Sequence, residues 1–332
     1  MKTIMFSSGF GICYFSISMI IGIDMMGGDY APLEAVKGIH MFFAQYPTTP
    51  AKLVLIGHQE LVQPLLTAHA IPMDKIAFVH AAEVIDMHEH PTKALKEKKQ
   101  SSIAIGFQLL ASGKMDAFIS AGNTGAMLVG ALFSIKALDG VIRPTISTII
   151  PKLNGGKGLL LDVGLNADCK PEQLNQFATM GTVYAALVLG IHQPRVGLIN
   201  VGEEEGKGNL LAQATYPLLK ENKHIHFVGN IEGRDVLMDK ADVMVCEGFT
   251  GNIILKMAES LYEINKQQQI NSPYLDRFNF ENYGGTPVLG VAKPVIIGHG
   301  ISGALSFMNM LHLAQVMLEK DVMQQMSKEL KD

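Results

Sequence analysis

The chain has 332 residues, of which 48% are hydrophobic and 17% are charged, so it can bury the core of one large or two medium domains. The formal net charge is −4 and the only basic run, Lys93–Lys99, is short, which argues against a nucleic-acid partner. The three cysteines, Cys13, Cys169 and Cys246, have no paired spacing. This pattern favours a reducing compartment and argues against a metal cage.

The first 18 residues stand apart from the rest. Phe10–Ile23 is mostly apolar and follows Lys2, as in a weak secretory leader, but no small-residue cleavage site follows it. The stretch is also short for a membrane span. Ile20–Ile23 is better explained as a first buried strand. We therefore expect residues 1–18 to be a non-native or disordered extension, with Met19 as a candidate start.

Strand and helix patterns alternate from residue 19 to residue 140, which is typical of a mostly parallel sheet covered by helices. The expected strands are Ile20–Asp24, Leu53–Gly57, Ile76–His80 and Ala117–Ile119, and the expected helices are Leu33–Tyr46, Gln59–Ala70, Ser102–Ser112 and Ala126–Leu138.

A different pattern begins after residue 140. Ser147–Pro151 and Gly158–Asp162 flank the turn Asn154–Lys157, which predicts a hairpin and a boundary between two α/β parts, 19–140 and 141–325, that share one cleft. The further strands expected are Val196–Val201, Ile225–Val228, Val243–Cys246, Pro287–Val291 and Ala292–Ile297, and the further helices are Glu172–Leu189, Leu210–Glu221, Gly251–Lys266 and Ala304–Leu318.

Two turns spell Gly-x-Thr-Gly, and each lies between a strand pattern and a helix pattern: Ser120–Gly125 and Glu247–Asn252. Helix starts carry unpaired N–H groups and attract anions. Two similar turns suggest two anion-binding corners that face one cleft, although ordinary turns with small residues would look the same. The candidate binding residues here are Ser120, Gly122, Asn123, Thr124, Gly125, Gly248, Thr250 and Gly251, and Asn252 is a candidate catalytic residue.

Other polar residues follow expected strands, where ligands bind in open α/β sheets. Lys207 lies between two glycines that leave its ammonium group open to an anion, so it is a candidate catalytic residue, with an exposed charged turn as the alternative. His299 also lies between glycines, and a merely packed histidine would fit as well. The candidate binding residues of this kind are Asp24, Gly27, Gly28, Asp29, Asp162, Asn166, Asn209, Asn230 and His299.

Three further features of the sequence resemble functional sites. The three histidines of His80–His90 lack the i, i+4 spacing of a helical metal site, which favours a solvated polar loop. Cys169 has no evident histidine partner, which argues against a catalytic thiol. Lys93–Lys99 is explained as an exposed helix face, with docking of an acidic partner as the functional alternative.

Together, these motifs resemble those of the bacterial phosphate acyltransferase of phospholipid synthesis, from about Met19 to about Gln325. The motifs that carry the resemblance are Asp24–Pro32, Ser120–Gly125, Asp162–Pro171, Gly202–Asn209, Gly229–Asp235 and Glu247–Asn252. Three features depart from the family pattern. Glu247 stands where Asp is usual, Leu165 stands where Ala is usual, and Ile264–Asn282 is shorter and more polar than the family's apolar helical tip. The last departure bears on membrane docking more than on catalysis.

The resemblance implies a three-layer α/β/α fold of the phosphotransacetylase and isopropylmalate-dehydrogenase type, with a deep cleft. It implies a cytoplasmic homodimer, dimerising through the hairpin and helices of its second part and peripheral on the inner face of the membrane. The reaction would convert acyl-[acyl carrier protein] and inorganic phosphate to acyl phosphate for a membrane glycerol-3-phosphate acyltransferase, with no metal or cofactor.

The chemistry requires donors for phosphate and for an oxyanion, and a route for a leaving thiolate. Lys207 would meet phosphate or the thiolate, Asn252 would meet the oxyanion, and the aspartates would orient these donors. The alternatives are a coenzyme A-dependent phosphate acetyl- or butyryltransferase, a nicotinamide-dependent decarboxylating dehydrogenase, and a binding protein without activity. The scarcity of arginine counts against the dehydrogenase.

Overall fold

The computed structural model describes residues 19–331. The expected extension, residues 1–18, lies outside the described residues. Within residues 19–331, all strands belong to one 11-stranded sheet with the order β3-β2-β1-β4-β11-β10-β5-β6-β9-β7-β8. The strands are β1 Ile20–Asp24, β2 Lys52–Gly57, β3 Ile76–His80, β4 Ala117–Ser120, β5 Thr145–Pro151, β6 Lys157–Leu161, β7 Arg195–Ile199, β8 His226–Ile231, β9 Val243–Val245, β10 Thr286–Leu289 and β11 Val295–Ile297.

Helices flank the sheet on both faces. They are α1 Leu33–Gln45, α2 Gln59–Ala68, α3 Pro91–Glu97, α4 Ser102–Ala111, α5 Thr124–Gly130, α6 Pro171–Leu187, α7 Leu210–Glu221, α8 Gly248–Gln267, α9 Pro273–Asp276, α10 Ala304–Glu319 and α11 Val322–Glu329. A π-helical segment, Ala131–Ile135, continues α5. One core lies between the sheet and α1, α6 and α10, and a second lies between the sheet and α4, α5 and α8. The fold is therefore the expected three-layer α/β arrangement with a mostly parallel sheet.

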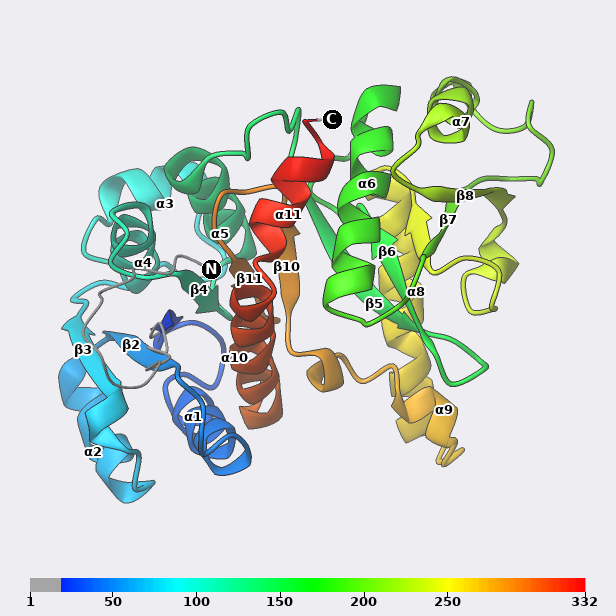
Figure 1. Cartoon of the computed structure of the whole chain (residues 1–332). Coiled ribbons are helices and arrows are strands. Elements are labelled where there is room, and N and C mark those ends of the chain that lie inside the picture. The colour runs from blue at the N-terminus through cyan, green and yellow to red at the C-terminus, as the bar shows by residue number, and fades with distance from the viewer. Residues whose placement is uncertain (1–18, 332) are drawn as a thin grey trace, which may run out of the picture.

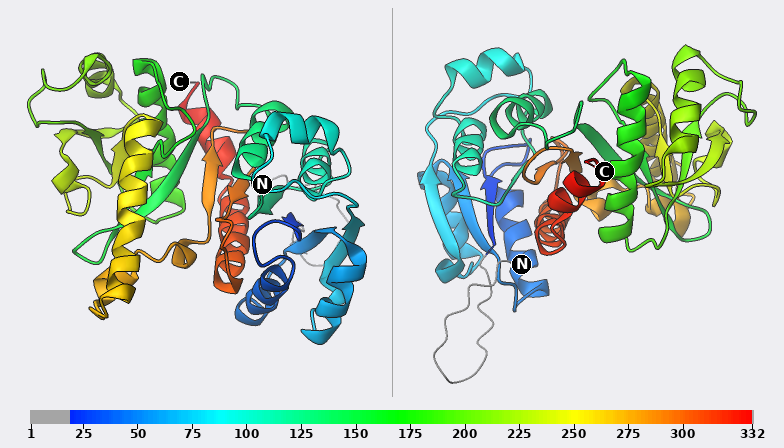
Figure 2. Two further views of the ribbon diagram at one scale, coloured as in Figure 1. Left: turned by 180° about the vertical axis from the view of Figure 1, so that it is seen from behind. Right: turned by 45° about the horizontal axis from the view of Figure 1, so that its top comes forward.

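The sheet changes character at its centre. The outer strands pair in parallel on each side, whereas β10 pairs antiparallel with both β11 and β5, and β5 pairs antiparallel with β6. The end of the chain returns to the first half, because β11 pairs with β4 and α10 packs on α1 (Figures 1 and 2). The boundary near residue 140 stays a prediction as a domain limit.

Several elements differ from the sequence patterns in length. The expected helix over residues 126–138 begins at Thr124 and changes to a π-helix at Ala131, and α8 begins at Gly248 inside the second Gly-x-Thr-Gly turn. The short helix α9 and the C-terminal α11 were not predicted. Among the described residues, no helix combines the length and the apolar character that crossing a membrane requires.

Candidate active site

The first group of predicted site residues forms at the ends of β1 and β4. The Ser120 hydroxyl donates a hydrogen bond to Asp24 Oδ2 at 2.7 Å, and the Met26 N–H donates to Oδ1 at 2.9 Å. Burial raises the pKa of the Asp24 carboxyl, while hydrogen bonds from Ser102 and Ser120 act in the opposite direction. Asp24 thus connects the end of β1 to the start of the first Gly-x-Thr-Gly turn through hydrogen bonds.

Glycines allow three strand-end loops to touch in this group. A Cβ on Gly27 would lie 2.5 Å from the backbone nitrogen of Gly122, so a larger residue would push the two turns apart. Gly28 has a φ of +99°, and the Asp29 N–H donates to the Gly300 carbonyl at 2.7 Å. The loops after β1, β4 and β11 therefore meet at one place.

Asn123 has a structural task in the first turn. Its Oδ1 accepts a hydrogen bond from the Ala126 N–H at 2.9 Å and caps α5. Its Nδ2 donates to three carbonyls of the segment 86–89, at 2.9 to 3.2 Å. Thr124 is exposed, and Gly125 lies in the first turn of α5. Of these three predicted residues, Thr124 has the side chain that is open to a ligand.

The second group forms where β6 ends. Asp162 Oδ1 accepts from the N–H groups of Gly164 and Leu165 at 3.0 Å each, and Oδ2 accepts from the N–H and the side-chain amide of Asn166 at 2.9 and 2.6 Å. Burial raises the pKa of the Asp162 carboxyl against these hydrogen bonds. The atypical Leu165 contributes a backbone group here, which its side chain does not alter.

The start of α8 packs directly on this loop. A Cβ on Gly248 would lie 2.7 Å from the Asn166 carbonyl oxygen, and a Cβ on Gly251 would lie 1.8 Å from the Asp162 carbonyl oxygen. Neither backbone oxygen can move aside without disturbing the loop. The second Gly-x-Thr-Gly turn therefore needs its glycines for close packing.

The polar side chains of the second turn are held in place. Glu247 caps α8, accepting from the Thr250 N–H at 2.7 Å and from the Thr250 hydroxyl. The Asn252 Nδ2 donates to the Val163 carbonyl at 3.1 Å. Because an amide NH₂ group has two donors, one N–H of Asn252 remains for a ligand.

Lys207, Asn209 and Asn230 lie around the loop between β7 and α7. Asn209 caps α7 by accepting from the Ala212 N–H at 2.8 Å, and Asn230 Nδ2 donates to the Glu204 carbonyl at 2.9 Å. Asn230 Oδ1 is buried, and within residues 19–331 it has no hydrogen-bond partner. Lys207 is exposed, and the described part of the chain offers its ammonium group no ion-pair partner within 4.0 Å.

A cavity of about 200 Å³ joins this loop to the second turn. Its lining includes Asn200, Asn209, Glu247 and Thr250. Asn200 supports the loop, because its Nδ2 donates to the Lys207 carbonyl at 3.0 Å. Asn200 was not predicted as a site residue, although it directly follows β7 as the other candidates follow their strands.

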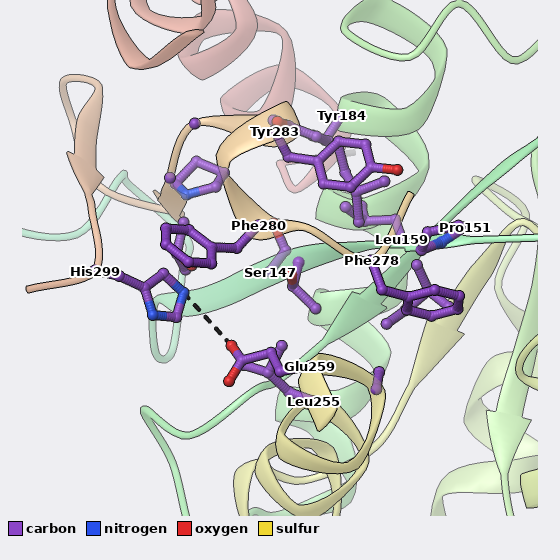
Figure 3. Close-up of a pocket in the computed structure, with 18 residues that line it drawn as sticks. Ser147, Pro151, Leu159, Tyr184, Leu255, Glu259, Phe278, Phe280, Tyr283 and His299 are labelled. Atoms are coloured by element: carbon purple, nitrogen blue, oxygen red, sulfur yellow. Dashed lines mark ion pairs between the residues drawn. The ribbon is translucent and has the colours of Figure 1, made fainter. Parts of the chain in front are cut away.

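His299 connects the two groups. The Gly298 N–H donates to the Ser120 carbonyl at 2.8 Å, so His299 lies beside the first turn. Its Nε2 lies 3.5 Å from Glu259 Oε1 on α8, and the two side chains point toward one another in Figure 3. Burial lowers the pKa of His299, and the charge of Glu259 opposes this shift. Glu259 was not predicted, because nothing in its local pattern indicates a partner from the other half of the sheet.

The His299–Glu259 pair lies at one end of an apolar pocket (Figure 3). Aromatic rings dominate the lining, and the ring centroids of His299 and Phe280 are 4.4 Å apart. The Ser147 hydroxyl is buried in this pocket without a hydrogen-bond partner in the described structure. The other large side chains of the lining are Ile149, Ile150, Pro151, Leu159, Tyr184, Leu255, Phe278 and Tyr283. The pocket thus offers an apolar wall beside polar groups.

The structure gives little support to a catalytic thiol at Cys169 or to a metal site at His80–His90. Burial, followed by the charges of Asp162 and Glu247, raises the pKa of Cys169 to about 12, which keeps the thiol protonated and poorly nucleophilic near neutral pH. The His80–His90 segment forms no metal-binding cluster, and neither does any other set of three or more His, Cys, Asp or Glu residues within 19–331.

Comparison with solved structures shows that the three-layer α/β fold is that of the phosphotransacetylases. The phosphotransacetylase of Streptococcus pyogenes superposes with a TM-score of 0.64 at 16% identity, covering 90% of this chain and 93% of that one, which shows the fold alone.

Sequence comparison gives the family. A model described as "Fatty acid synthesis protein" matches residues 19–325. The phosphate acyltransferase of Dictyoglomus turgidum is 41% identical over 323 residues, which are 92% of this chain and 95% of that protein. That of Syntrophomonas wolfei is 39% identical over 317 residues, which are 94% and 98%. The chain belongs to the phosphate acyltransferase family, and it is an acyltransferase of lipid biosynthesis.

Proposed function

We propose that the enzyme transfers a fatty acyl group from acyl-[acyl carrier protein] to inorganic phosphate and so supplies acyl phosphate for phosphatidic acid synthesis. The observation that carries this proposal is the set of polar strand-end groups in a chain of this family, with an apolar-lined pocket of about 40 Å³ beside them. A fatty acyl chain needs an apolar wall, and a phosphate needs N–H groups and positive charge.

A phosphate oxygen attacks the thioester carbonyl, the C–O bond forms, and the C–S bond breaks after a tetrahedral oxyanion. The thiolate leaves with the carrier protein and takes a proton from solvent. Asn252 directs its remaining N–H toward the oxyanion. Lys207, whose backbone is held by Asn200 of the 200 Å³ cavity, meets phosphate or the departing thiolate. Asp24 accepts a hydrogen bond from Ser120 beside the first turn, and the loop that Asp162 orders packs against the second turn. Phosphate is itself the nucleophile, so the proposal includes no metal or cofactor.

The proposed assembly is a cytoplasmic homodimer that works with a membrane glycerol-3-phosphate acyltransferase and rests peripherally on the inner face of the membrane. Three apolar side chains of α8, spaced four residues apart, are 53% to 71% exposed: Phe249, Ile253 and Met257. Such a stripe suits burial against a second copy of the chain. Light scattering of the protein and of Met257→Glu tests this assembly, since the variant is expected to shift toward the monomer.

The reaction is tested by following the thioester of palmitoyl-[acyl carrier protein] with and without inorganic phosphate, beside palmitoyl-coenzyme A. Phosphate-dependent loss of the carrier-protein thioester, with an acyl phosphate that hydroxylamine traps, would support the proposal. Activity with coenzyme A thioesters alone would place the enzyme among the coenzyme A-dependent phosphate acyltransferases.

Lys207 has its own test. Lys207→Ala is expected to lower kcat/KM by about 100-fold, in the range of a lost donor to a developing charge, with unchanged stability because the side chain is exposed. Lys223→Ala, on the exposed turn before β8, is the matched control and should keep wild-type kinetics. Near-normal turnover of Lys207→Ala would remove Lys207 from the mechanism.

A further inference from the structure

A hollow lies on the first half of the molecule, away from the pocket of Figure 3. It is enclosed by α3, α4 and the π-helical end of α5, and it has a volume of about 490 Å³. Its floor is apolar, with Leu95, Phe107 and Val129, and its rim carries Phe133, Lys96 and Lys99. We call this hollow the α3 groove.

The rim of the α3 groove exposes a large apolar ring. Phe133 is 75% exposed, although it belongs to a regular helical segment whose neighbour Ile135 is buried. The segment is π-helical, a rare conformation that frequently occurs at functional sites. A phenylalanine beside an apolar hollow is a typical feature of a protein-binding surface.

The rim also carries positive charge that the molecule does not neutralise. Lys98 forms an ion pair with Glu89 at 2.6 Å, whereas Lys93, Lys96 and Lys99 are exposed and form no ion pair within the described residues. Lys96 and Lys99 line the groove itself, whereas Lys93 and the exposed Lys136 lie outside its lining. Exposed charges of one sign steer and orient an oppositely charged partner.

The α3 groove begins beside the candidate active site. Pro91 opens α3 and abuts the first Gly-x-Thr-Gly turn so closely that a Cβ on Gly125 would lie 2.3 Å from Pro91 Cγ. The seven residues of α3 span about 10 Å at 1.5 Å per residue. A partner in the groove would therefore sit about one short helix away from the turn.

From these observations we propose that the α3 groove docks the acidic carrier protein that delivers the acyl thioester, through an acidic helix face with apolar side chains. This proposal rests on the proposed function, because the partner is the donor substrate of that reaction. The concave, apolar floor suits a helix, which a flat lipid surface would not fill. The lysines on the rim supply the complementary charge, and the adjacent turn receives the flexible arm that carries the thioester.

The test compares two substrates that share the thioester and differ in the protein. Palmitoyl-[acyl carrier protein] would use the α3 groove, whereas palmitoyl-pantetheine lacks the docking protein. The double variant Lys96→Glu/Lys99→Glu is expected to raise KM for the carrier-protein thioester at least about tenfold, since two attractive contacts become repulsive. The KM for palmitoyl-pantetheine should stay within about twofold, and the salt dependence of the first KM should flatten.

Two further variants separate docking at the α3 groove from a general effect of charge. Phe133→Ala removes the exposed ring without changing charge and should raise KM for the carrier-protein thioester about threefold or more, with little effect on folding because the ring is exposed. Lys320→Glu makes one substitution of the same type at the end of α10, on the opposite face of the sheet, and should leave both KM values unchanged.

Defined results would overturn the proposal. An unchanged KM for the carrier-protein thioester in the double variant would do so, and so would equal losses with both substrates. Loss of binding to anionic vesicles with an unchanged KM would assign the surface to lipid, and a changed oligomeric state of Phe133→Ala would assign it to a second copy.

If the wild type turns over neither substrate, the proposed function fails. Titration of the carrier protein against wild type and double variant then still decides whether the groove binds it.

Discussion

The two Gly-x-Thr-Gly turns share a sequence pattern and a place after a strand, yet they are supported in different ways. The first turn is held from outside, since Asp24 reaches it through the Ser120 hydroxyl and Asn123 fastens it to the segment 86–89. The second turn rests on the Asp162 loop, whose own backbone N–H groups satisfy the aspartate. A common motif therefore specifies a common backbone shape, not a common set of supporting contacts.

The helices that follow differ as well. The first turn begins α5, which has 7 residues before the π-helical segment, and its cap is the neutral amide of Asn123. The second begins α8, which has 20 residues, and its cap is the carboxylate of Glu247. The first turn leads toward the α3 groove and the second leads toward the apolar pocket. This difference suits a site in which one turn faces the incoming carrier and the other faces the acyl chain.

The largest effect expected from this comparison is that of Gly251→Ala. Its Cβ would lie 1.8 Å from the Asp162 carbonyl oxygen, which belongs to the backbone, so we expect a loss of about 3 kcal/mol in unfolding free energy and of most phosphate-dependent turnover. Gly125→Ala meets the Pro91 ring and should cost about 1 kcal/mol. Urea unfolding measures both, and Gly233→Ala, which meets no atom within 4 Å, is the control. Equal stability of Gly251→Ala and Gly233→Ala would contradict the packing of the second turn.

A smaller difference is expected between the two buried aspartates. Asp162→Asn turns an NH₂ group toward backbone donors and leaves at least one pair unsatisfied, which should cost about 2 kcal/mol. Asp24→Asn should cost about 1 kcal/mol, because the Ser120 hydroxyl can rotate and accept from the new amide. Chemical denaturation of both variants at pH 7 ranks them, and the reverse order would show that Asp24 is the more tightly held carboxylate.

Local sequence patterns predicted most strands and both turns, because alternation of apolar residues and strand-end glycines are properties of short segments. Contacts between distant segments were not predictable in this way. The return of β11 to the first half and the approach of Glu259 to His299 depend on how the halves pack. The exposure of Phe133 depends on how the π-helical segment packs on α4. His299 itself stood out by its flanking glycines, but its partner has no such signal.

The smallest expected effect concerns the contact between His299 and Glu259, which connects the two groups of site residues. Burial lowers the pKa of His299 from its usual 6.5, Lys256 lowers it further, and Glu259 opposes both. The unfolded chain thus binds this proton more tightly, so the contribution of His299 to stability is complete above pH 6.5 and is lost as the pH falls below that value. We expect the unfolding free energy of wild type to fall more steeply than that of His299→Asn between pH 7 and pH 5, by under about 1 kcal/mol.

NMR titration of the His299 ring directly measures the lowered pKa that causes this pH dependence. Wild type should titrate below 6.5, Glu259→Gln should lower the His299 pKa further by removing the attractive charge at 3.5 Å, and Lys256→Gln should raise it. An imidazole that titrates above 6.5 in wild type would mean that the ion pair outweighs burial. His299 would then be charged near neutral pH and would clamp the two halves of the sheet through Glu259.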